Sequence, residues 1–255
     1  MPDRCPTPFP ARTALAGAAT LAVTAGLGLL AEIPAAHAQT PTSEPQRVRV
    51  GSLLFDRTEV TIAQFARFAD ATGTVTRAER EGGGFEYAGG WQRRPGWTWR
   101  TPDGAAPASA QLPAVHLTHA EAEAYCRWAG GRLPTAAEWI SAAYTEQRAA
   151  PPAPFARGTT YPYPTGLSTQ GANTSGTDPW PRAAPAGATA AGVNGLYDMG
   201  ANVWEWVSDA QGGDRRTMGG SWWYGAEQMR AEVNAWKAAD FYAVYIGFRC
   251  VAQAD

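Results

Sequence analysis

The sequence predicts an α+β domain rather than a parallel, doubly wound sheet. Two well-marked helix starts lie in the first half of the domain, short strand patterns gather towards its C-terminal end, and the stretches between them show little regular periodicity. Because helical and strand patterns are segregated along the chain, the alternating β-α units that build a parallel sheet are not expected. No internal repeat is present, so these patterns describe one domain.

Residues 1–38 have the pattern of a signal peptide. Arg4 and Arg12 form a basic start, residues 13–30 are almost wholly apolar, and residues 36–38 (Ala-His-Ala) place small side chains where a signal peptidase cleaves. An uncleaved membrane anchor is the alternative, since the apolar run is nearly long enough to span a bilayer. We expect cleavage and a periplasmic mature protein that does not contact a membrane.

Removal of this segment would leave a flexible linker over residues 39–46 and a single domain over residues 47–255, which is long enough to build its own core. The chain contains 21 Lys and Arg against 23 Asp and Glu, a formal net charge of −2, and no basic stripe. Nucleic acid and an anionic membrane surface are therefore not expected as partners. No glycine-rich dinucleotide fingerprint is present, so the sequence does not predict an NAD or flavin cofactor.

The N-terminal part of the domain combines a strand, a helix and a long irregular stretch. Residues 47–55 alternate between apolar and polar positions, which predicts a strand. Over residues 61–70 the apolar side chains recur at helical spacing, which predicts a helix. Residues 74–110 are rich in Gly, Pro, Trp and Arg without a clear period. Because their tryptophans are poorly suited to solvent, we expect an ordered loop that packs onto the core.

Two capping boxes mark the starts of the next helices. Thr118 with Glu121, and Thr135 with Glu138, have the spacing at which a hydroxyl and a carboxylate bond each other's backbone amides. Gly130 follows the apolar positions of the first of these helices and is expected to end it. The sequence therefore predicts two helices whose first turns are well defined.

The C-terminal part is expected to contain loops and short strands. Residues 149–154 form a break rich in proline and alanine, and residues 161–192 are again rich in loop-forming residues. Short strands are predicted near residues 202–207, 216–222 and 244–251. Glycines alternate with aromatic residues in this region, which indicates an irregular but specific core.

The cysteines suggest one disulfide. Cys5 lies in the predicted signal peptide, so the mature chain keeps Cys126 and Cys250. Two cysteines in an exported protein favour a disulfide. A metal site or a reactive thiol is the alternative, but neither cysteine has supporting ligands nearby in the sequence.

Five motifs follow one another through the mature chain, at residues 59–65, 124–139, 195–206, 219–224 and 246–251. They include Gly-Gly-Arg-Leu-Pro-Thr in the second motif, Gly-Gly-Ser-Trp-Trp-Tyr in the fourth and Gly-Phe-Arg in the last. In this order they resemble the formylglycine-generating enzyme-like family, also called sulfatase-modifying factor domains. The resemblance implies a C-type-lectin-like fold with little regular secondary structure.

The resemblance also implies a structural disulfide between Cys126 and Cys250, which match positions that pair in the family. The best-known members convert a cysteine of a client sulfatase to formylglycine, using copper held by two further cysteines. The matching positions here are Tyr224 and Met229, and a soft copper(I) site needs thiolates. Formylglycine generation by that mechanism is therefore disfavoured.

A second branch of the family, the sulfoxide synthases of the ergothioneine type, uses iron held by three histidines, two of them from an added helical domain. Only His116 and His119 follow the signal segment, and the added domain is missing. We expect these two histidines to make local hydrogen bonds or to lie on the surface rather than to bind iron.

A third branch acts in maturation of the siderophore pyoverdine, where the family protein is implicated in oxidising the dihydro chromophore. Its members resemble this chain in export, in size and in the stretch at residues 219–226, and they also lack the copper cysteines. A glutamate shortly after this stretch is implicated in catalysis; Glu232 is the best match, and Glu227 is the nearby competitor. Ser221 matches an active-site serine of the family, although a serine after two glycines also caps a turn.

Glu232 has two interpretations. As a general base it would be walled by aromatic rings, whose presence would raise its pKa by desolvation and let it accept a proton. These rings are Trp222, Trp223, Tyr224 and Trp236. The same rings would bind an aromatic substrate by stacking. As a surface residue, Glu232 would instead pair with Arg230 or Arg249. Arg249 itself is expected to be structural, because Gly-Phe-Arg occurs in family members with different chemistries.

The resemblance further implies two calcium sites. The first would use side-chain and carbonyl oxygens of Asn173, Thr174, Asp178 and Trp180. The second would use those of Asp198, Gly200, Val203 and Glu205. Hard oxygen ligands spread over turns suit Ca²⁺ and would fix loops that lack regular hydrogen bonding. At the second site the alternative is that the two carboxylates only cap backbone amides.

The predicted function is an exported oxidoreductase-like enzyme that oxidises a small aromatic or peptidic metabolite, such as a siderophore precursor, with Glu232 as base. The sequence does not identify the electron acceptor, and dioxygen is only a guess. The alternative is a non-catalytic C-type-lectin-like binding module, since fold alone does not decide function. One form of this alternative is a diversified receptor, whose variable positions would lie within residues 234–245.

Overall fold

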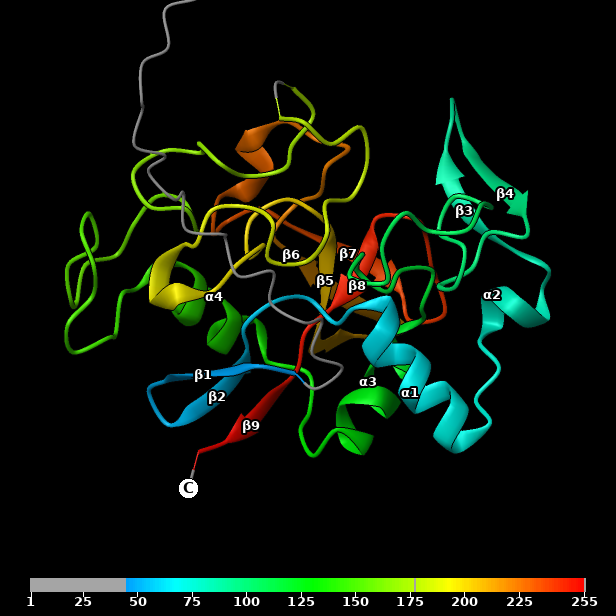
Figure 1. Ribbon diagram of the computed structural model, residues 1–255, viewed down its shortest axis with the longest axis horizontal. Coiled ribbons are helices and arrows are strands. Elements are labelled where there is room, and N and C mark those ends of the chain that lie inside the picture. Colours follow the sequence, from blue (N-terminus) through cyan, green and yellow to red (C-terminus); the bar gives the residue numbers. More distant parts are fainter. Residues whose placement is uncertain (1–44, 177, 255) are drawn as a thin grey trace, which may run out of the picture. The chain divides into compact units, whose positions relative to one another are not determined.

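Helices dominate the first part of the described chain. The largest sheet, of four strands, is built from the C-terminal part (Figure 1). The computed structural model describes residues 45–254 except residue 177. The predicted signal peptide and residues 39–44 of the predicted linker lie outside the described residues. Within the described part, no helix is both long enough and apolar enough to cross a membrane.

Strands from the two ends of the domain form one antiparallel sheet. β1 (Arg47–Val50) and β2 (Leu53–Asp56) make a hairpin, and β9 (Val251–Gln253) pairs with the other edge of β2. The strand expected over residues 47–55 is therefore divided, because Gly51 turns the chain with a φ of 60° that a continuing strand does not adopt. This pairing places the start of the domain beside its last strand.

Three helices begin where the sequence predicts them. α1 (Ile62–Thr72), α3 (His119–Trp128) and α4 (Ala136–Tyr144) each start with a capping box, in which the N-cap side chain and the third helical side chain bond each other's backbone amides. α1 ends at Gly73 in the left-handed conformation, and Gly130 follows α3 at a φ of 74°. The predictions of these three helices, and of the glycine after α3, are confirmed.

The segment expected to be an ordered loop, residues 74–110, contains a short helix and a hairpin. α2 (Arg77–Arg80) leads into β3 (Gly83–Tyr87), which pairs antiparallel with β4 (Trp91–Pro95). The hairpin lies at the right-hand edge of Figure 1. Glycines and arginines interrupt its apolar alternation, so the usual strand pattern is missing from the sequence. This hairpin carries two of the rings of the candidate site.

The C-terminal strands form a four-stranded sheet in the order β7-β6-β5-β8. β5 (Trp204–Gln211) and β6 (Asp214–Met218) make its central hairpin, and β7 (Asn234–Ala238) pairs with the outer edge of β6. β8 (Ile246–Phe248) runs parallel to β5. The two edge strands, β7 and β8, are close in the sequence but lie on opposite sides of the β5–β6 hairpin.

These strands agree with the sequence prediction in part. The strands expected near residues 202–207 and 216–222 correspond to β5 and β6, whereas β7 was not predicted. The strand expected over residues 244–251 is divided between two sheets, as β8 and β9. The chain passes from one sheet to the other at Arg249 and Cys250, whose side chains bond Glu205 of β5 and Cys126 of α3.

Aromatic rings link α1, α3 and β8 in the core. Phe65 of α1 lies 5.0 Å from Trp99 and 5.8 Å from Tyr125 between ring centroids, and it meets Phe248 edge-on at 6.4 Å. All four rings are buried. Trp99 thus packs inward as expected for a tryptophan of the long early segment.

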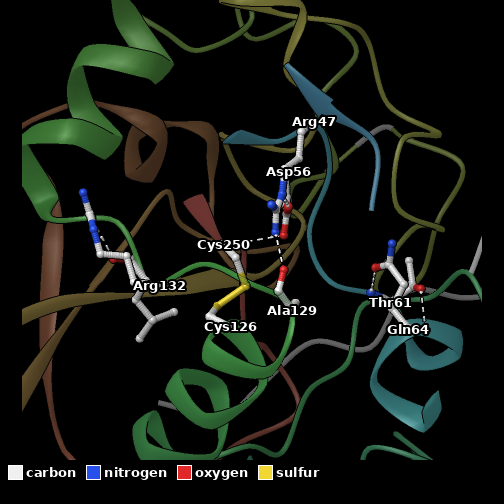
Figure 2. The surroundings of a disulfide bond; sticks show 9 residues. Arg47, Asp56, Thr61, Gln64, Cys126, Ala129, Arg132 and Cys250 are labelled. Atoms are coloured by element: carbon white, nitrogen blue, oxygen red, sulfur yellow. Dashed lines mark hydrogen bonds and ion pairs between the residues drawn. A yellow bond between two sulfur atoms is a disulfide. The ribbon is translucent and has the colours of Figure 1, made fainter. Parts of the chain in front are cut away.

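A buried disulfide joins the last part of α3 to the C-terminal strands. Cys126 and Cys250 are bonded, with their Cα atoms 5.5 Å apart (Figure 2), which confirms the predicted pair. The Cys250 amide donates to Asp56 Oδ2 at 3.0 Å, and Arg47 Nε donates to Asp56 Oδ1 at 3.1 Å. Arg47 also donates to the carbonyl of Ala129 at 2.9 Å. These contacts hold the β1–β2 hairpin against the elements that the disulfide links.

Candidate functional site

Two glycines carry the chain out of β6 into the segment with the adjacent tryptophans. Gly219 and Gly220 have φ of 96° and 82°, a region that L side chains rarely adopt. At Gly219 a Cβ would also lie 2.9 Å from the carbonyl oxygen of Met199, so only glycine fits this position. The Trp222 amide then donates to the carbonyl of Asn202 at 2.8 Å, which fixes the start of the segment.

Ser221 is buried at the base of this turn. Its Oγ accepts a hydrogen bond from the Trp223 amide at 3.4 Å, and its carbonyl accepts one from the Tyr224 amide at 3.0 Å. These contacts are those of a turn cap, the second of the two roles considered for this serine. With only 1% of its surface exposed, Ser221 is not positioned to meet a substrate directly.

The aromatic side chains that follow gather around Tyr245. Trp223 stacks on the Tyr245 ring at 6.4 Å with an interplanar angle of 28°, and Tyr224 meets it edge-on at 6.3 Å. From the β3–β4 hairpin, Trp91 lies 5.8 Å from Tyr245 and 5.6 Å from Tyr87. We call this cluster, together with Phe241 at 4.7 Å from Trp91, the aromatic face.

Large parts of the aromatic face are open to solvent. Tyr87, Trp91 and Trp223 are 44%, 44% and 43% exposed. Two of these three rings, Tyr87 and Trp91, belong to the hairpin that the sequence did not predict, so sequence reasoning missed most of the exposed surface. Phe85 and Tyr87 alternate with Glu86, but the glycines and arginines around them interrupt this pattern, so the sequence carried no clear strand signal.

The tyrosines of the aromatic face are held as neutral phenols. Burial raises the pKa of Tyr245, and the neighbouring phenols of Tyr224 and Tyr87 raise it further. Burial also raises the pKa of Tyr224. The Tyr245 hydroxyl is buried and has no hydrogen-bond partner among the described residues. At neutral pH these groups therefore offer hydrogen-bond donors rather than bases.

Trp236 does not belong to this cluster. It lies on β7, where it is 37% exposed and packs against the guanidinium of Arg216, its cross-strand neighbour, at 5.8 Å. The expected wall of four rings therefore contains only Trp222, Trp223 and Tyr224. The physical reason is that Trp236 sits in an edge strand, which the sequence prediction treated as irregular chain.

Glu232 is placed differently from its expected role as a shielded base. Its side chain is exposed, and its carboxylate makes no hydrogen bond or ion pair with the residues that the structure describes. This exposure does not match the shielded carboxylate that the base interpretation expected. Glu227 is exposed as well. The ion pairs of Glu232 with Arg230 or Arg249, expected for a surface residue, do not form. Arg230 instead donates to the Tyr163 hydroxyl, and Arg249 is buried.

Arg249 is instead the cation of a buried charge cluster. Its Nη2 and Nε lie 2.6 and 2.7 Å from the two carboxylate oxygens of Glu205. Trp139 Nε1 donates to the same carboxylate at 2.8 Å, and Arg249 Nη2 also donates to the Tyr197 carbonyl. Arg249 and Glu205 are at most 1% exposed. This geometry supports the expectation that Arg249 is structural.

Two more buried carboxyl groups complete the cluster. Glu59 accepts from the Val203 amide at 3.0 Å and from Asn202 Nδ2 at 2.6 Å. Burial raises the pKa of Glu59 well above its ordinary range, and the charges of Asp198 and Glu205 raise it further. Burial likewise raises the pKa of Asp198. Three acidic groups thus share one arginine, which favours protonation of the least well paired of them.

The second predicted calcium set does not fit a cation in this arrangement. The Glu205 oxygens already accept three N–H donors, and those of Asp198 accept from the Gly187 amide at 2.6 Å and from the Thr189 hydroxyl. A cation there would have to compete with Arg249 for Glu205. The loop that supplies the carbonyls expected from Gly200 and Val203 is strained, because Ala201 within it has a φ of 66°.

The first predicted calcium set fits better. Asp178 accepts from the amides of Thr174 and Trp180 at 2.9 and 3.0 Å, so the four expected residues do come together in one loop. The Asn173 side chain is buried, and its Oδ1 has no hydrogen-bond partner among the described residues. The unpaired Asn173 Oδ1 is a hard oxygen of the kind that Ca²⁺ binds, whereas both Asp178 oxygens already accept backbone amides. No group of three or more His, Cys, Asp or Glu side chains poised for a metal occurs within the described ranges.

The two histidines make local hydrogen bonds, as expected, but both are buried rather than at the surface. His116 Nε2 lies 2.8 Å from the Pro102 carbonyl, and His119 Nε2 lies 3.1 Å from that of Val207. Burial lowers the pKa of His116 to about 4 and also lowers the pKa of His119. Both imidazoles are therefore neutral at pH 7.

The positions that match the copper cysteines are occupied by packed side chains. Met229 is fully buried against Ala172 and Ala201, and Tyr224 is half-buried on the aromatic face. Cys126 and Cys250 are bonded to each other and offer no thiolate. The two thiolates of a two-cysteine copper site are therefore not available at these places.

Known proteins are similar to this chain along most of its length. The family model described as "Sulfatase-modifying factor enzyme 1-like domain" matches residues 8–254. A formylglycine-generating enzyme of Thermomonospora curvata is 30% identical over 278 residues, which cover 87% of this chain and 89% of that enzyme. A hercynine oxygenase of Mycolicibacterium thermoresistibile is 29% identical over 82% of this chain and 52% of its own length.

Among solved structures, PvdO from Pseudomonas aeruginosa aligns with a TM-score of 0.60 at 20% sequence identity. The alignment covers 79% of this chain and 80% of that one. At this identity the likeness concerns the fold. It confirms the predicted α+β architecture of the C-type-lectin-like, sulfatase-modifying-factor type.

Proposed function

The chain belongs to the sulfatase-modifying factor enzyme 1-like family, and from that premise we propose that it is an exported oxidative enzyme acting on an aromatic peptidic metabolite. A siderophore precursor of the pyoverdine type is the proposed substrate class. The family includes relatives named for oxidative chemistry, such as hercynine oxygenase. Export is proposed from the signal-like pattern of residues 1–38.

The exposed aromatic face carries this proposal. Tyr87, Trp91 and Trp223 together present three rings, each more than two-fifths exposed, backed by the buried ring of Tyr245. Exposed apolar surface gathered in one place is typical of a binding site. Planar rings bind an aromatic group by offset or edge-to-face contact, worth about 0.5–1.5 kcal/mol per pair beyond the buried area. A flat chromophore precursor is therefore a suitable occupant.

The proposed reaction is a two-electron dehydrogenation. The substrate loses one hydrogen as a proton to a base and the second as a hydride equivalent to dioxygen. The proton then joins the reduced oxygen, so that the products are the oxidised substrate and hydrogen peroxide. We assign the base to Glu232, following the family resemblance. Because its carboxylate is exposed, any desolvation that activates it must come from the bound substrate.

The test compares secreted metabolites of a strain that lacks the gene after complementation with wild type, Glu232→Gln or Glu227→Gln. Glu227 is the matched control, since it is an exposed glutamate of the same segment. We expect the deletion and the Glu232 variant to accumulate a precursor two hydrogens heavier than the product. The Glu227 variant should restore the normal profile.

A second measurement uses purified protein and the isolated precursor, with and without air. Peroxide formed in equal amount to oxidised product supports dioxygen as acceptor. If Glu232→Gln is exported, folded and fully active, Glu232 is not the base. If the deletion strain has a normal profile under iron limitation, the siderophore assignment is wrong.

The exposure of Glu232 favours one alternative, a binding module without catalysis. The pKa values of Tyr224 and Tyr245 on the aromatic face are raised by burial, so these two phenols are not bases near pH 7. In this case an aromatic metabolite would bind the purified protein and be recovered unchanged in air. Trp91→Ala should weaken such binding, because Trp91 contacts both Tyr245 and Phe241.

A further inference from the structure

A cavity of about 430 Å³ lies next to the aromatic face. Its walls come from the loop at residues 102–115, from the segment at residues 180–185, and from Trp222 and Val244. Volumes of roughly 300–1,000 Å³ are usual for small-molecule sites. The cavity is therefore large enough for a compact organic ligand, and none of the chemistry proposed above uses it.

Trp222 and Val244 stand between this cavity and the aromatic face. Each is followed in the sequence by a residue of that face, Trp223 and Tyr245. The Trp222 ring lies 5.5 Å from the Trp223 ring and 6.4 Å from the Tyr245 ring. Among the described residues that line the cavity there is no ring of the aromatic face. The two are therefore neighbouring but separate sites.

The walls of the cavity offer a ligand few hydrogen-bond donors. The amides of Leu112 and Val244 already donate, to the carbonyls of Ser109 and Phe85 respectively, at 3.2 and 2.9 Å. The Ser109 hydroxyl accepts from the Gln111 amide at 3.1 Å. Proline has no N–H group, and the prolines of the lining are Pro102, Pro107, Pro113, Pro181 and Pro185. A ligand that needs several hydrogen bonds is therefore not suited to these walls.

The charged side chains of the described lining, Asp103 and Arg182, have opposite signs. The Arg182 guanidinium lies between the rings of Trp97 and Trp222, 5.1 and 5.6 Å from their centroids, and pairs with Glu86 at 3.6 Å. The Arg182 side chain is 41% exposed and Asp103 is exposed as well, so solvent screens both charges. The Nη1 of Arg182 and the Nε1 of Trp222 have under 1 Å² of accessible surface, so a ligand does not reach them. An ionised ligand would therefore lose hydration without gaining a partner.

The rest of the lining is apolar and held in place. Val115 and Val244 are 1% and 4% exposed, and they belong to the buried core around Phe65. The prolines of the two loop segments have a fixed φ, which limits the movement of these walls. A wall that is already in position binds a ligand at a lower cost in conformational entropy. The cavity is thus a preformed apolar site.

We propose that this cavity binds an uncharged, mostly apolar compound that carries an aromatic ring system. Burial of the ligand's apolar surface against Val244 and Trp222 would supply most of the affinity. Trp180 and Trp222 suit a ring, because aromatic pairs favour offset or edge-on contact. Asp103 and Pro181 are exposed residues of the lining, and the ligand would enter on their side. The proposal does not depend on the oxidative function.

The test uses two fluorescent probes that share one ring framework. N-phenyl-1-naphthylamine is uncharged, and 1-anilinonaphthalene-8-sulfonate differs from it by one sulfonate group. Titration of the purified wild-type protein should give an affinity at least roughly tenfold higher for the uncharged probe, because the sulfonate would be desolvated without a partner. Naphthalene, which is uncharged and apolar, should compete with this probe.

A filling substitution separates the cavity from the aromatic face. Ala183→Leu enlarges a side chain of the lining and should weaken binding of the uncharged probe roughly tenfold, because the added carbons occupy ligand volume. Ala186→Leu is the matched control, since Ala186 is a partly exposed alanine nearby that is not part of the lining. Trp91→Ala removes a ring of the aromatic face. Both of these variants should leave the affinity unchanged.

A further measurement needs no variant. In methyl spectra of the wild-type protein, the resonances of Leu112, Val115 and Val244 should shift when naphthalene is added, because these residues line the cavity. The methyl resonances of Leu196 and Val207 should stay in place, since these residues belong to a different buried cluster.

Three results would overturn the proposal. The first is no binding of the uncharged probe at its solubility limit, and the second is equal affinity for the two probes. The third is binding that is lost in Trp91→Ala and retained in Ala183→Leu, which would place the probe on the aromatic face.

Discussion

At the residue scale, buried polar side chains divide into those with partners and those without. Asn194 is fully satisfied, since its Oδ1 accepts from the Gln147 amide at 2.7 Å and its Nδ2 donates to the carbonyls of Ala142 and Thr145 at 2.8 Å. Asn173 is equally buried, but its Oδ1 has no partner in the described structure. An unpaired buried acceptor costs about 1–3 kcal/mol. A cation at this oxygen would recover that free energy.

We therefore expect calcium to stabilise the protein through Asn173. At a calcium concentration about 100 times the dissociation constant, the free energy of unfolding should rise by about 2.7 kcal/mol, because the ion binds the folded state. Thermal unfolding with calcium and with a chelator measures the difference. Asn173→Ala should remove most of this response.

Asn194→Ala is the matched control for that experiment. It removes a buried asparagine whose hydrogen bonds are all made within the protein, so it should lower stability but keep the calcium response. Equal responses in wild type and Asn173→Ala would show that calcium, if it binds, does so elsewhere.

At the scale of elements, the start of α4 is held by charge as well as by its cap. Glu138 accepts from the Thr135 amide at 2.8 Å and binds Arg132 through both carboxylate oxygens at 2.7 Å. The hydrogen bond with Arg132 is the main cause that lowers the pKa of Glu138 to about 2. The helix is therefore tied to the strand-like segment that precedes it only while this carboxylate is ionised.

This pairing predicts an acid-sensitive contribution to stability. The folded pKa of Glu138 lies below the ordinary value of 4.5, so its contribution is complete above that pH and is lost as pH falls towards 2. About 1–2 kcal/mol of unfolding free energy should disappear over this range, allowing for partial exposure of the pair. In Glu138→Gln the same part of the pH profile, measured by denaturant unfolding, should be flatter.

Glu123→Gln provides the control on a neighbouring helix. Glu123 pairs with Arg127 at 3.0 Å, but both side chains are largely exposed. Exposed pairs of this kind contribute little, so the acid profile of this variant should match the wild type. A Glu138 variant with an unchanged profile would contradict the assigned role of the pair.

At the scale of the whole molecule, one covalent bond links segments that are far apart in the sequence. The disulfide joins Cys126 to Cys250 across 124 residues, and the last strand pairs with β2 of the first hairpin. By restricting the unfolded chain, a loop of this length contributes about 4–5 kcal/mol in the loop-entropy model. The bond therefore supports the association of the N-terminal and C-terminal parts of the domain.

We expect replacement of both cysteines to lower the unfolding free energy by about 4–5 kcal/mol. The comparison is between the oxidised wild type and Cys126→Ala/Cys250→Ala in denaturant titrations. A reductant should lower the stability of the wild type towards that of the variant and leave the variant unchanged. A double variant as stable as the oxidised protein would mean that packing alone holds these segments.

The sequence by itself determined the features that depend on neighbours in the chain. Capping boxes at Thr118 and Thr135 involve residues three apart, so the starts of α3 and α4 could be predicted from local chemistry. The ordered set of motifs likewise identified the family and, through it, the disulfide. These signals survive in a linear sequence because each is a short pattern.

Only the tertiary structure decided which side chains share a surface. The aromatic face joins Tyr87 and Trp91 of one hairpin to Trp223 and Tyr245, more than 130 residues further on. Local spacing gave no sign of that meeting. It also left open whether Glu232 is shielded or at the surface, and the folded chain exposes its side chain. Exposure and proximity depend on long-range pairing of strands, which short sequence patterns do not encode.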